Sequence, residues 1–160
     1  PLHVPLHSAA ITGVDVCARK PLVATCSVDR SVRVWNYLEH TMEAVKVFQD
    51  EPLSVAIHPS GLHVLVGFQD AVRYINLLMD EMRVFREINV KQCREARFSH
   101  GGHLFALANS TVVQVYGSYS CELVTSLRAH KARIQALCWS HDDSAIVSTD
   151  VDGQVALGLF

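Results

Sequence analysis

The sequence predicts an all-β fold, a β-propeller of about four consecutive four-stranded antiparallel blades, of which the last is incomplete. Four segments of the chain resemble one another, and they begin at Leu22, His63, His103 and Ser144. Their polar turn residues recur at intervals of 41, 40 and 42 residues, at Asp29, Asp70, Ser110 and Asp152. A period near forty indicates a propeller or an α-solenoid. Each segment also alternates apolar and polar residues, which is typical of half-buried strands.

Each repeat is predicted to contain strands joined by polar turns. The first turn is rich in residues that favour turns, at 18–21, 58–61, 99–102 and 140–143. The second turn carries the recurring Asp or Ser. A fourth strand at the outer edge of the blade is predicted at 44–48, 82–88 and 123–127. The expected units are therefore residues 7–49, 50–88, 89–127 and 128–160.

A helical alternative exists for the linker of the first repeat. Leu38, Met42, Val45 and Phe48 fall at helical spacing, so this segment alone is compatible with an α-solenoid. An α-solenoid would need two helical periods in every repeat. The stretches 32–34 and 112–115 are instead rich in β-branched valine, which favours strands, and we predict the propeller.

Composition excludes several classes of protein. The chain has 160 residues, of which 49% are hydrophobic, so it can bury a sizeable core. Lys and Arg total 14 against 16 Asp and Glu, and the net charge of -2 is scattered along the chain. This pattern predicts no binding to nucleic acid or to an anionic membrane. The apolar runs are far shorter than the roughly 20 residues of a membrane-spanning helix.

Cysteine usage and the chain ends indicate a segment of an intracellular protein. The five cysteines contain no C-x-x-C motif and no disulfide or zinc spacing, so we expect reduced thiols and a cytoplasmic location. The chain begins with Pro1 and ends at Phe160, within the expected third strand of the fourth unit. We expect further blades in a longer protein, since a complete ring removes the exposed strand edge.

The first repeat contains four residues that fit a hydrogen-bonded network, His7, Ser27, Asp29 and Trp35. A carboxylate in a tight turn needs donors, and imidazole and hydroxyl groups supply them. At these spacings the four residues resemble the signature of the WD-repeat family. The resemblance implies that Asp29 bonds to His7 and that Ser27 and Trp35 complete the chain of hydrogen bonds, as a structural tetrad.

The other repeats retain only parts of this tetrad. His130 and Asp152 stand 22 residues apart, the same separation as the histidine and aspartate of the first repeat, while Asp150 occupies the serine position. The second repeat keeps Asp70 but has Phe68 at the serine position. We therefore expect partial tetrads at Asp70, His130 and Asp152.

A more specific resemblance covers most of the chain. The stretches 11–36, 44–65 and 93–104 are similar to a group of cilia- and flagella-associated WD-repeat proteins. The resemblance implies a long axonemal protein of the cytoskeleton, with tandem propellers and a coiled coil, that helps position inner-arm dyneins and regulates ciliary or flagellar motility. Its implied partners are inner-arm dynein subunits and proteins associated with doublet microtubules.

Chemical motifs are weak, and we expect no enzyme, no metal, no cofactor and no small-molecule substrate. The pair His100 and His103 lacks a third ligand from Cys or a carboxylate. The Ser, Asp and His of the first repeat lack the G-x-S-x-G context of a hydrolase, and no phosphate-binding loop is present. Positions expected on first strands, Thr12, Ser54 and Arg94, form no cluster of acids or histidines.

The expected function is protein binding by a scaffold, and charged loop residues are the candidate contacts. These are Arg30, Arg73, Lys91, Lys131 and Arg133. The alternative is a substrate receptor or adaptor of another cytoplasmic complex, such as a ubiquitin ligase. Receptors of that kind often carry Trp-Asp-x-Arg after the third strand, whereas residues 35–38 here read Trp-Asn-Tyr-Leu.

Overall fold

The computed structural model describes residues 7–79 and 81–159, and these residues form four antiparallel sheets. The first sheet contains β1 (Ile11–Val16), β2 (Leu22–Ser27), β3 (Ser31–Asn36) and β4 (Thr41–Val47). The second contains β5 (Ser54–Ile57), β6 (His63–Gly67), β7 (Val72–Leu77) and β8 (Met82–Ile88). The third contains β9 (Ala96–Phe98), β10 (Leu104–Asn109), β11 (Val112–Gly117) and β12 (Leu123–Leu127). The fourth contains β13 (Ile134–Trp139), β14 (Ala145–Asp150) and β15 (Val155–Leu159).

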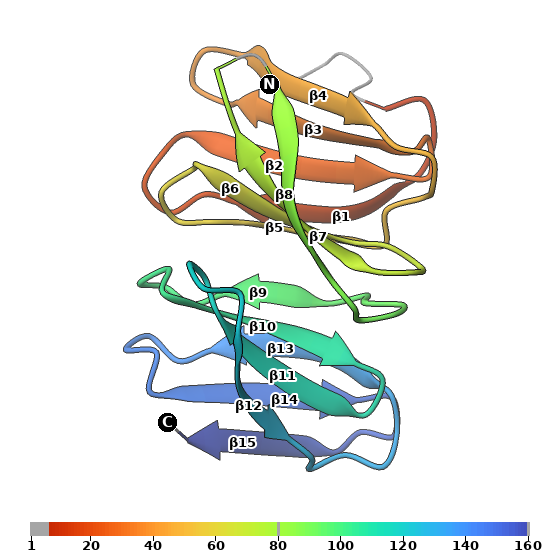
Figure 1. Cartoon of the computed structure of the whole chain (residues 1–160), viewed down its shortest axis with the longest axis vertical. Coiled ribbons are helices and arrows are strands. Elements are labelled where there is room, and N and C mark those ends of the chain that lie inside the picture. Colours follow the sequence, from red (N-terminus) through yellow and green to blue (C-terminus); the bar gives the residue numbers. More distant parts are fainter. Residues whose placement is uncertain (1–6, 80, 160) are drawn as a thin grey trace.

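Each sheet is a run of consecutive strands in which every strand pairs with the next one along the chain. Figure 1 shows this order, because the strands of one sheet carry neighbouring colours. The first strands β1, β5, β9 and β13 contact their neighbours in that order, as the innermost strands of a propeller do. The predicted fold class is confirmed: the sheets are blades of a β-propeller, and the fourth has three strands within the described residues.

The segment with helical spacing is a strand. The outer strand β4 occupies Thr41–Val47, so it begins three residues before the predicted start at residue 44. The reason lies in the preceding turn, where the Asn36 side-chain oxygen accepts hydrogen bonds from the amides of Leu38 and Glu39 and His40 has a φ of 57°. No helix of the described residues is long and apolar enough to cross a membrane.

The hydrophobic core lies between the blades. The first cluster joins the first two sheets, with Val34 packed in the same cluster as Val64 and Ile75. The second joins the second and third sheets around Tyr74 and Phe105, and the third joins the last two sheets. Because every cluster draws on two consecutive sheets, each blade is stabilised by its neighbours.

Hydrogen bonds also tie each blade to the next. The hydroxyl of Thr12 in β1 donates to the carbonyl of Pro52 at 2.8 Å, and the hydroxyl of Ser54 in β5 donates to the carbonyl of Cys93 at 2.8 Å. Both acceptors lie in the loop that leads into the following blade. At the opposite ends of these strands, His58 Nε2 lies 2.7 Å from the Gly102 carbonyl. Hydrogen bonds therefore add to the core contacts at both ends of the first strands.

Candidate functional site

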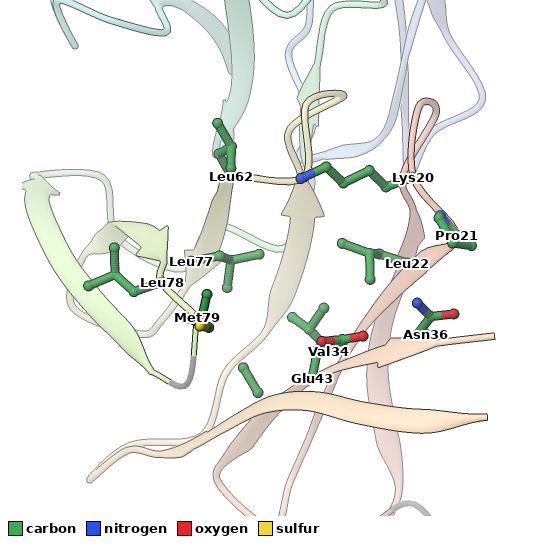
Figure 2. Close-up of a pocket in the computed structure, with 12 residues that line it drawn as sticks. Lys20, Pro21, Leu22, Val34, Asn36, Glu43, Leu62, Leu77, Leu78 and Met79 are labelled. Carbon is green, nitrogen blue, oxygen red and sulfur yellow. The ribbon is translucent and has the colours of Figure 1, made fainter. Parts of the chain in front are cut away.

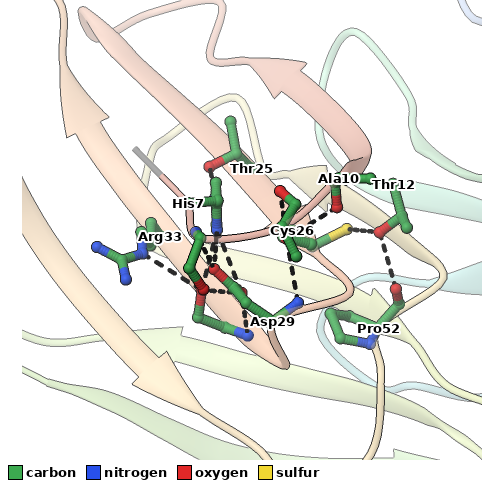
Figure 3. A network of polar contacts seen from close by, with 12 residues as sticks. His7, Ala10, Thr12, Thr25, Cys26, Asp29, Arg33 and Pro52 are labelled. Atoms are coloured by element: carbon green, nitrogen blue, oxygen red, sulfur yellow. Dashed lines mark hydrogen bonds and ion pairs between the residues drawn. The ribbon is translucent and has the colours of Figure 1, made fainter. Parts of the chain in front are cut away.

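The His7–Asp29 pair joins the loop before β1 to the turn between β2 and β3 (Figure 3). His7 Nδ1 lies 3.1 Å from Asp29 Oδ2, and His7 Nε2 lies 2.7 Å from the Thr25 hydroxyl. The Asp29 carboxylate also accepts hydrogen bonds from the Ser8 amide at 3.0 Å and from the Ser31 amide at 2.9 Å. We call this network the first His–Asp staple.

The staple is buried and its carboxylate is charged. The His7 side chain is 1% exposed and that of Asp29 is 8% exposed. Burial works against the charged form of Asp29, but the hydrogen bonds from Ser31, Ser8 and His7 outweigh it and hold the pKa of this carboxyl below its ordinary value of 3.8. Because the carboxylate can only accept, His7 Nδ1 is the donor.

Two members of the expected tetrad bond differently. The Ser27 hydroxyl donates to the Ala10 carbonyl at 2.8 Å and accepts from the Asp29 amide, so it fixes the backbone of the turn. Trp35 Nε1 is buried and has no hydrogen-bond partner within the described part of the chain. The expectation that Trp35 completes the chain is wrong, because the second nitrogen of His7 is already taken by Thr25.

The fourth blade contains a second His–Asp staple that uses a different carboxylate. His130 Nδ1 lies 2.9 Å from Asp150 Oδ2, and His130 Nε2 lies 2.7 Å from the Ser148 hydroxyl. Assigning Asp152 to this staple was therefore wrong. Asp150 ends β14 with a side chain that is 1% exposed, while Asp152 is exposed and donates its amide to Asp150 Oδ1.

The second blade replaces the staple by an aromatic pair. Phe48 and Phe68 stand 41 residues after His7 and Ser27, and their ring centroids are 4.9 Å apart. Asp70, the expected remnant of a tetrad, is exposed and faces Arg73 at 3.8 Å. Asp70 is therefore not paired with a histidine. The burial of Phe68 supplies the stabilisation that the polar network gives in the first and fourth blades.

Of the candidate partner contacts, Arg73 is engaged within the blade. Its side chain is 18% exposed, pairs with Glu87 at 3.1 Å and lies over the Phe68 ring at 4.5 Å. It lies in the strand β7 rather than in a loop, and its candidacy as a partner contact stays a prediction. The other four are exposed, namely Arg30, Lys91, Lys131 and Arg133. Arg30 lies in the β2–β3 turn and lines a shallow cleft of about 280 Å³ together with Asp50 and Glu51.

First-strand residues form a charged cluster that the sequence analysis missed. Arg97 in β9 pairs with Glu95 at 2.7 Å and with Asp15 of β1 at 3.6 Å. Burial raises the pKa of both carboxyls, although Arg97 opposes the rise. Asp15 Oδ2 also accepts from the Ile57 amide at 2.8 Å, so the cluster links three blades. The only signal in the sequence was the presence of charged residues at alternating positions in and beside the first strands.

Several histidines of the described residues serve as hydrogen-bonding and packing groups. His100 packs against the His141 ring at 6.2 Å, and its Nε2 lies 3.4 Å from the Trp139 carbonyl. His63 bonds to the side chain of Asn76. Over residues 7–79 and 81–159, no group of three or more His, Cys, Asp or Glu is arranged to hold a metal ion. His3 lies outside the described residues.

Comparison with known proteins agrees with this geometry. The family described as "WD domain, G-beta repeat" matches residues 2–36 and 121–157. These two stretches contain the two histidines of the His–Asp staples and their hydroxyl partners. The four sheets, the staples and this match show that the chain has the fold of WD-repeat β-propeller blades.

The particular resemblance is to cilia- and flagella-associated protein 57. The chain is 50% identical to the mouse protein over 151 residues, which is 94% of this chain and 12% of the relative. It is 44% identical to cilia- and flagella-associated protein 57 A of Tetrahymena thermophila over 97% of the chain and 12% of the relative. Mouse echinoderm microtubule-associated protein-like 4 is 27% identical over 93% of the chain and 16% of the relative. The chain thus spans about an eighth of the length of the first two relatives.

Proposed function

We propose that this chain is part of a non-enzymatic scaffold of the ciliary or flagellar axoneme, which helps position inner-arm dyneins and so regulates motility. The observation that carries the proposal is the 50% identity to mouse cilia- and flagella-associated protein 57 across 94% of the chain. Two Tetrahymena relatives with the same name and one microtubule-associated relative also support a place on the axonemal cytoskeleton.

The arrangement of the polar groups supports a scaffold rather than an enzyme. The His and Asp side chains of the two staples are at most 8% exposed and hydrogen-bond to Thr25 and Ser148, so a substrate has little access to them. The charged cluster at Arg97 is also internally paired. What remains for function is the surface of the blades, which suits protein binding.

The unit boundaries 7–49, 50–88, 89–127 and 128–160 form part of the proposal. Each unit contains one sheet together with the loop that leads into it. In this arrangement His7 and His130 belong to the same unit as their carboxylate partners. The exposed cations Arg30, Lys91, Lys131 and Arg133 are proposed as contacts with axonemal proteins.

Proximity labelling in ciliated cells tests the proposal. A biotin ligase fused to the longer protein that contains this chain is compared with the same ligase directed to cilia alone. We expect axonemal retention after detergent extraction, with labelling of inner-arm dynein and doublet-microtubule proteins. Labelling of cullin adaptors without axonemal proteins would replace the proposal with the ubiquitin-ligase alternative.

A further inference from the structure

A groove of about 450 Å³ lies between the first and second blades, beside the β1–β2, β5–β6 and β7–β8 turns (Figure 2). Its floor is apolar and is formed by Leu22, Val34, Ala44 and Leu77. The first three of these side chains are largely buried in the core cluster between the two blades. A concave apolar site of this volume is within the range that accommodates ligand groups, about 300–1,000 Å³.

The rim of the groove exposes large apolar side chains to solvent. Leu62 is 50% exposed, Leu78 is 43% exposed and Met79 is 90% exposed. All three belong to turns of the second blade and line the same groove. Single exposed apolar residues are ordinary, but a group of them around a concave apolar floor indicates a binding surface.

The outer strands are linked differently at the two successive junctions. Lys46 in β4 donates through Nζ to the Met82 carbonyl at 3.1 Å, which links the first blade to the second. Arg86 in β8 donates through Nη1 to the Ser120 carbonyl at 3.0 Å, which links the second blade to the third. The residue 41 positions earlier, one repeat back, is Val45 in β4. A valine side chain cannot donate a hydrogen bond, so β4 makes no link at the position equivalent to Arg86 and is joined to the second blade by Lys46 instead.

Opposite charges flank the apolar floor. Lys20 and Glu43 both line the groove and both are exposed. Neither takes part in a salt bridge or a side-chain hydrogen bond within residues 7–79 and 81–159. In Figure 2 the ammonium group of Lys20 extends across the groove toward the loop that carries Leu62. A bound segment with a carboxylate beside its apolar residues would satisfy this cation.

We infer that this groove binds a short segment of a partner protein that carries two aliphatic side chains beside a carboxylate. The aliphatic groups pack on Leu22, Val34 and Leu77, and the carboxylate meets Lys20. Glu43 on the same groove disfavours an anionic lipid surface, and its free charge suits a basic residue of the same segment. The inference deepens the proposed function and rests on it only in taking the partner to be a protein.

Selection of displayed peptides tests the groove. The whole 160-residue chain is panned against random dodecapeptides, and the selected peptides are synthesised for fluorescence anisotropy. We expect peptides with paired aliphatic residues and a carboxylate. Their Kd should rise about tenfold or more on the double variant Leu62→Asp, Met79→Asp. The matched control is Tyr119→Asp, a 70% exposed residue in the β11–β12 turn of the next blade, which should change Kd less than about twofold.

The lysine contact is tested separately. Lys20→Glu should weaken an acidic peptide about fivefold or more, but should leave the same peptide with an amide in place of the carboxylate nearly unchanged. Because Lys20, Leu62 and Met79 are exposed, these variants should melt at the wild-type temperature.

Three results would overturn the inference. One is peptide binding that the groove variants do not affect. The second is a concentration-dependent dimer of the wild-type chain that Leu62→Asp, Met79→Asp abolishes, because the occupant would then be a second copy. The third is binding to phosphatidylserine vesicles that the same variant abolishes. Peptide binding by a protein that is absent from axonemes would instead refute the proposed function and leave the groove intact.

Discussion

Replacing Asp29 by alanine tests whether the first His–Asp staple stabilises its blade. The carboxylate accepts from His7, from the Ser8 amide and from the amide and hydroxyl of Ser31. In the variant the exposed Ser8 amide can turn to water, and His7 Nδ1 still has the Ser31 hydroxyl 3.0 Å away. The Ser31 amide is the donor that stays buried without a partner.

The expected loss of stability follows from the number of donors that the variant leaves without a partner. A buried donor without a partner costs about 1–3 kcal/mol, and the lost charge-assisted bond to His7 adds to it. We expect Asp29→Ala to lower the free energy of unfolding by about 2–3 kcal/mol. For a chain of this size, that corresponds to a fall in Tm of about 5–10 °C.

Thermal unfolding followed by circular dichroism measures this change. The difference in Tm between the wild type and Asp29→Ala should be constant from neutral pH down to about pH 5. The pKa of Asp29 is below its ordinary value of 3.8 in the folded chain, so its stabilising effect is present above pH 3.8. The effect should disappear as the pH falls below that value and through the lower folded-state pKa. An unchanged Tm at neutral pH would refute the stabilising role of the staple.

Three further predictions concern other parts of the chain. Asp150→Ala should lower Tm clearly, whereas Asp152→Ala should change it by less than about 2 °C, and equal effects in a melting scan would contradict the assignment of the second staple. Arg97→Met should destabilise the chain more at pH 7 than at pH 5, because the variant removes the positive charge that favours the ionised forms of Asp15 and Glu95. Urea titrations at the two pH values measure this, and a loss of stability that does not depend on pH would argue against the cluster. N-ethylmaleimide at pH 8 should modify the exposed Cys138 within minutes and leave Cys93 intact until urea is added, because Cys93 is buried and its pKa is raised to about 12. Mass spectrometry of the native chain measures this order, and modification of Cys93 before Cys138 would contradict the prediction.

The fold was predictable because its signal repeats. A period near forty, with polar turns at matching phase, constrains the whole topology even where a single segment is ambiguous. The 38–48 segment shows this, since its apolar spacing suits a helix and yet it contains the strand β4. Pairing with β3 decides the outcome there, because strand formation depends on neighbours more than on the segment itself.

The staples were predictable only in part. The separation of 22 residues identified His7 with Asp29 correctly, since both stand at fixed positions relative to β2. The same separation selected Asp152 over Asp150 in the fourth blade. Spacing selected the wrong carboxylate because Asp150 ends β14 and Asp152 lies in the turn that follows. Burial distinguishes the two, and it favours the carboxylate at the end of β14.

The Asp15, Arg97 and Glu95 cluster was not predictable because it depends on the angle between blades. Asp15 and Arg97 are far apart in the sequence and lie on first strands of the first and third blades. No periodicity within one repeat carries that information. The groove has the same origin, since its lining residues come from turns and strands of two neighbouring blades.

Equivalent positions in these blades are stabilised in two different ways. In the first and fourth blades a buried histidine hydrogen-bonds to a carboxylate and a hydroxyl, and removing one of these groups leaves the others without a partner. In the second blade Phe48 and Phe68 fill the corresponding positions without any polar group to satisfy. The second blade therefore has no buried aspartate in this turn, and Asp70 lies at the surface beside Arg73. The WD-repeat match covers the two stapled stretches, although all four sheets share one plan.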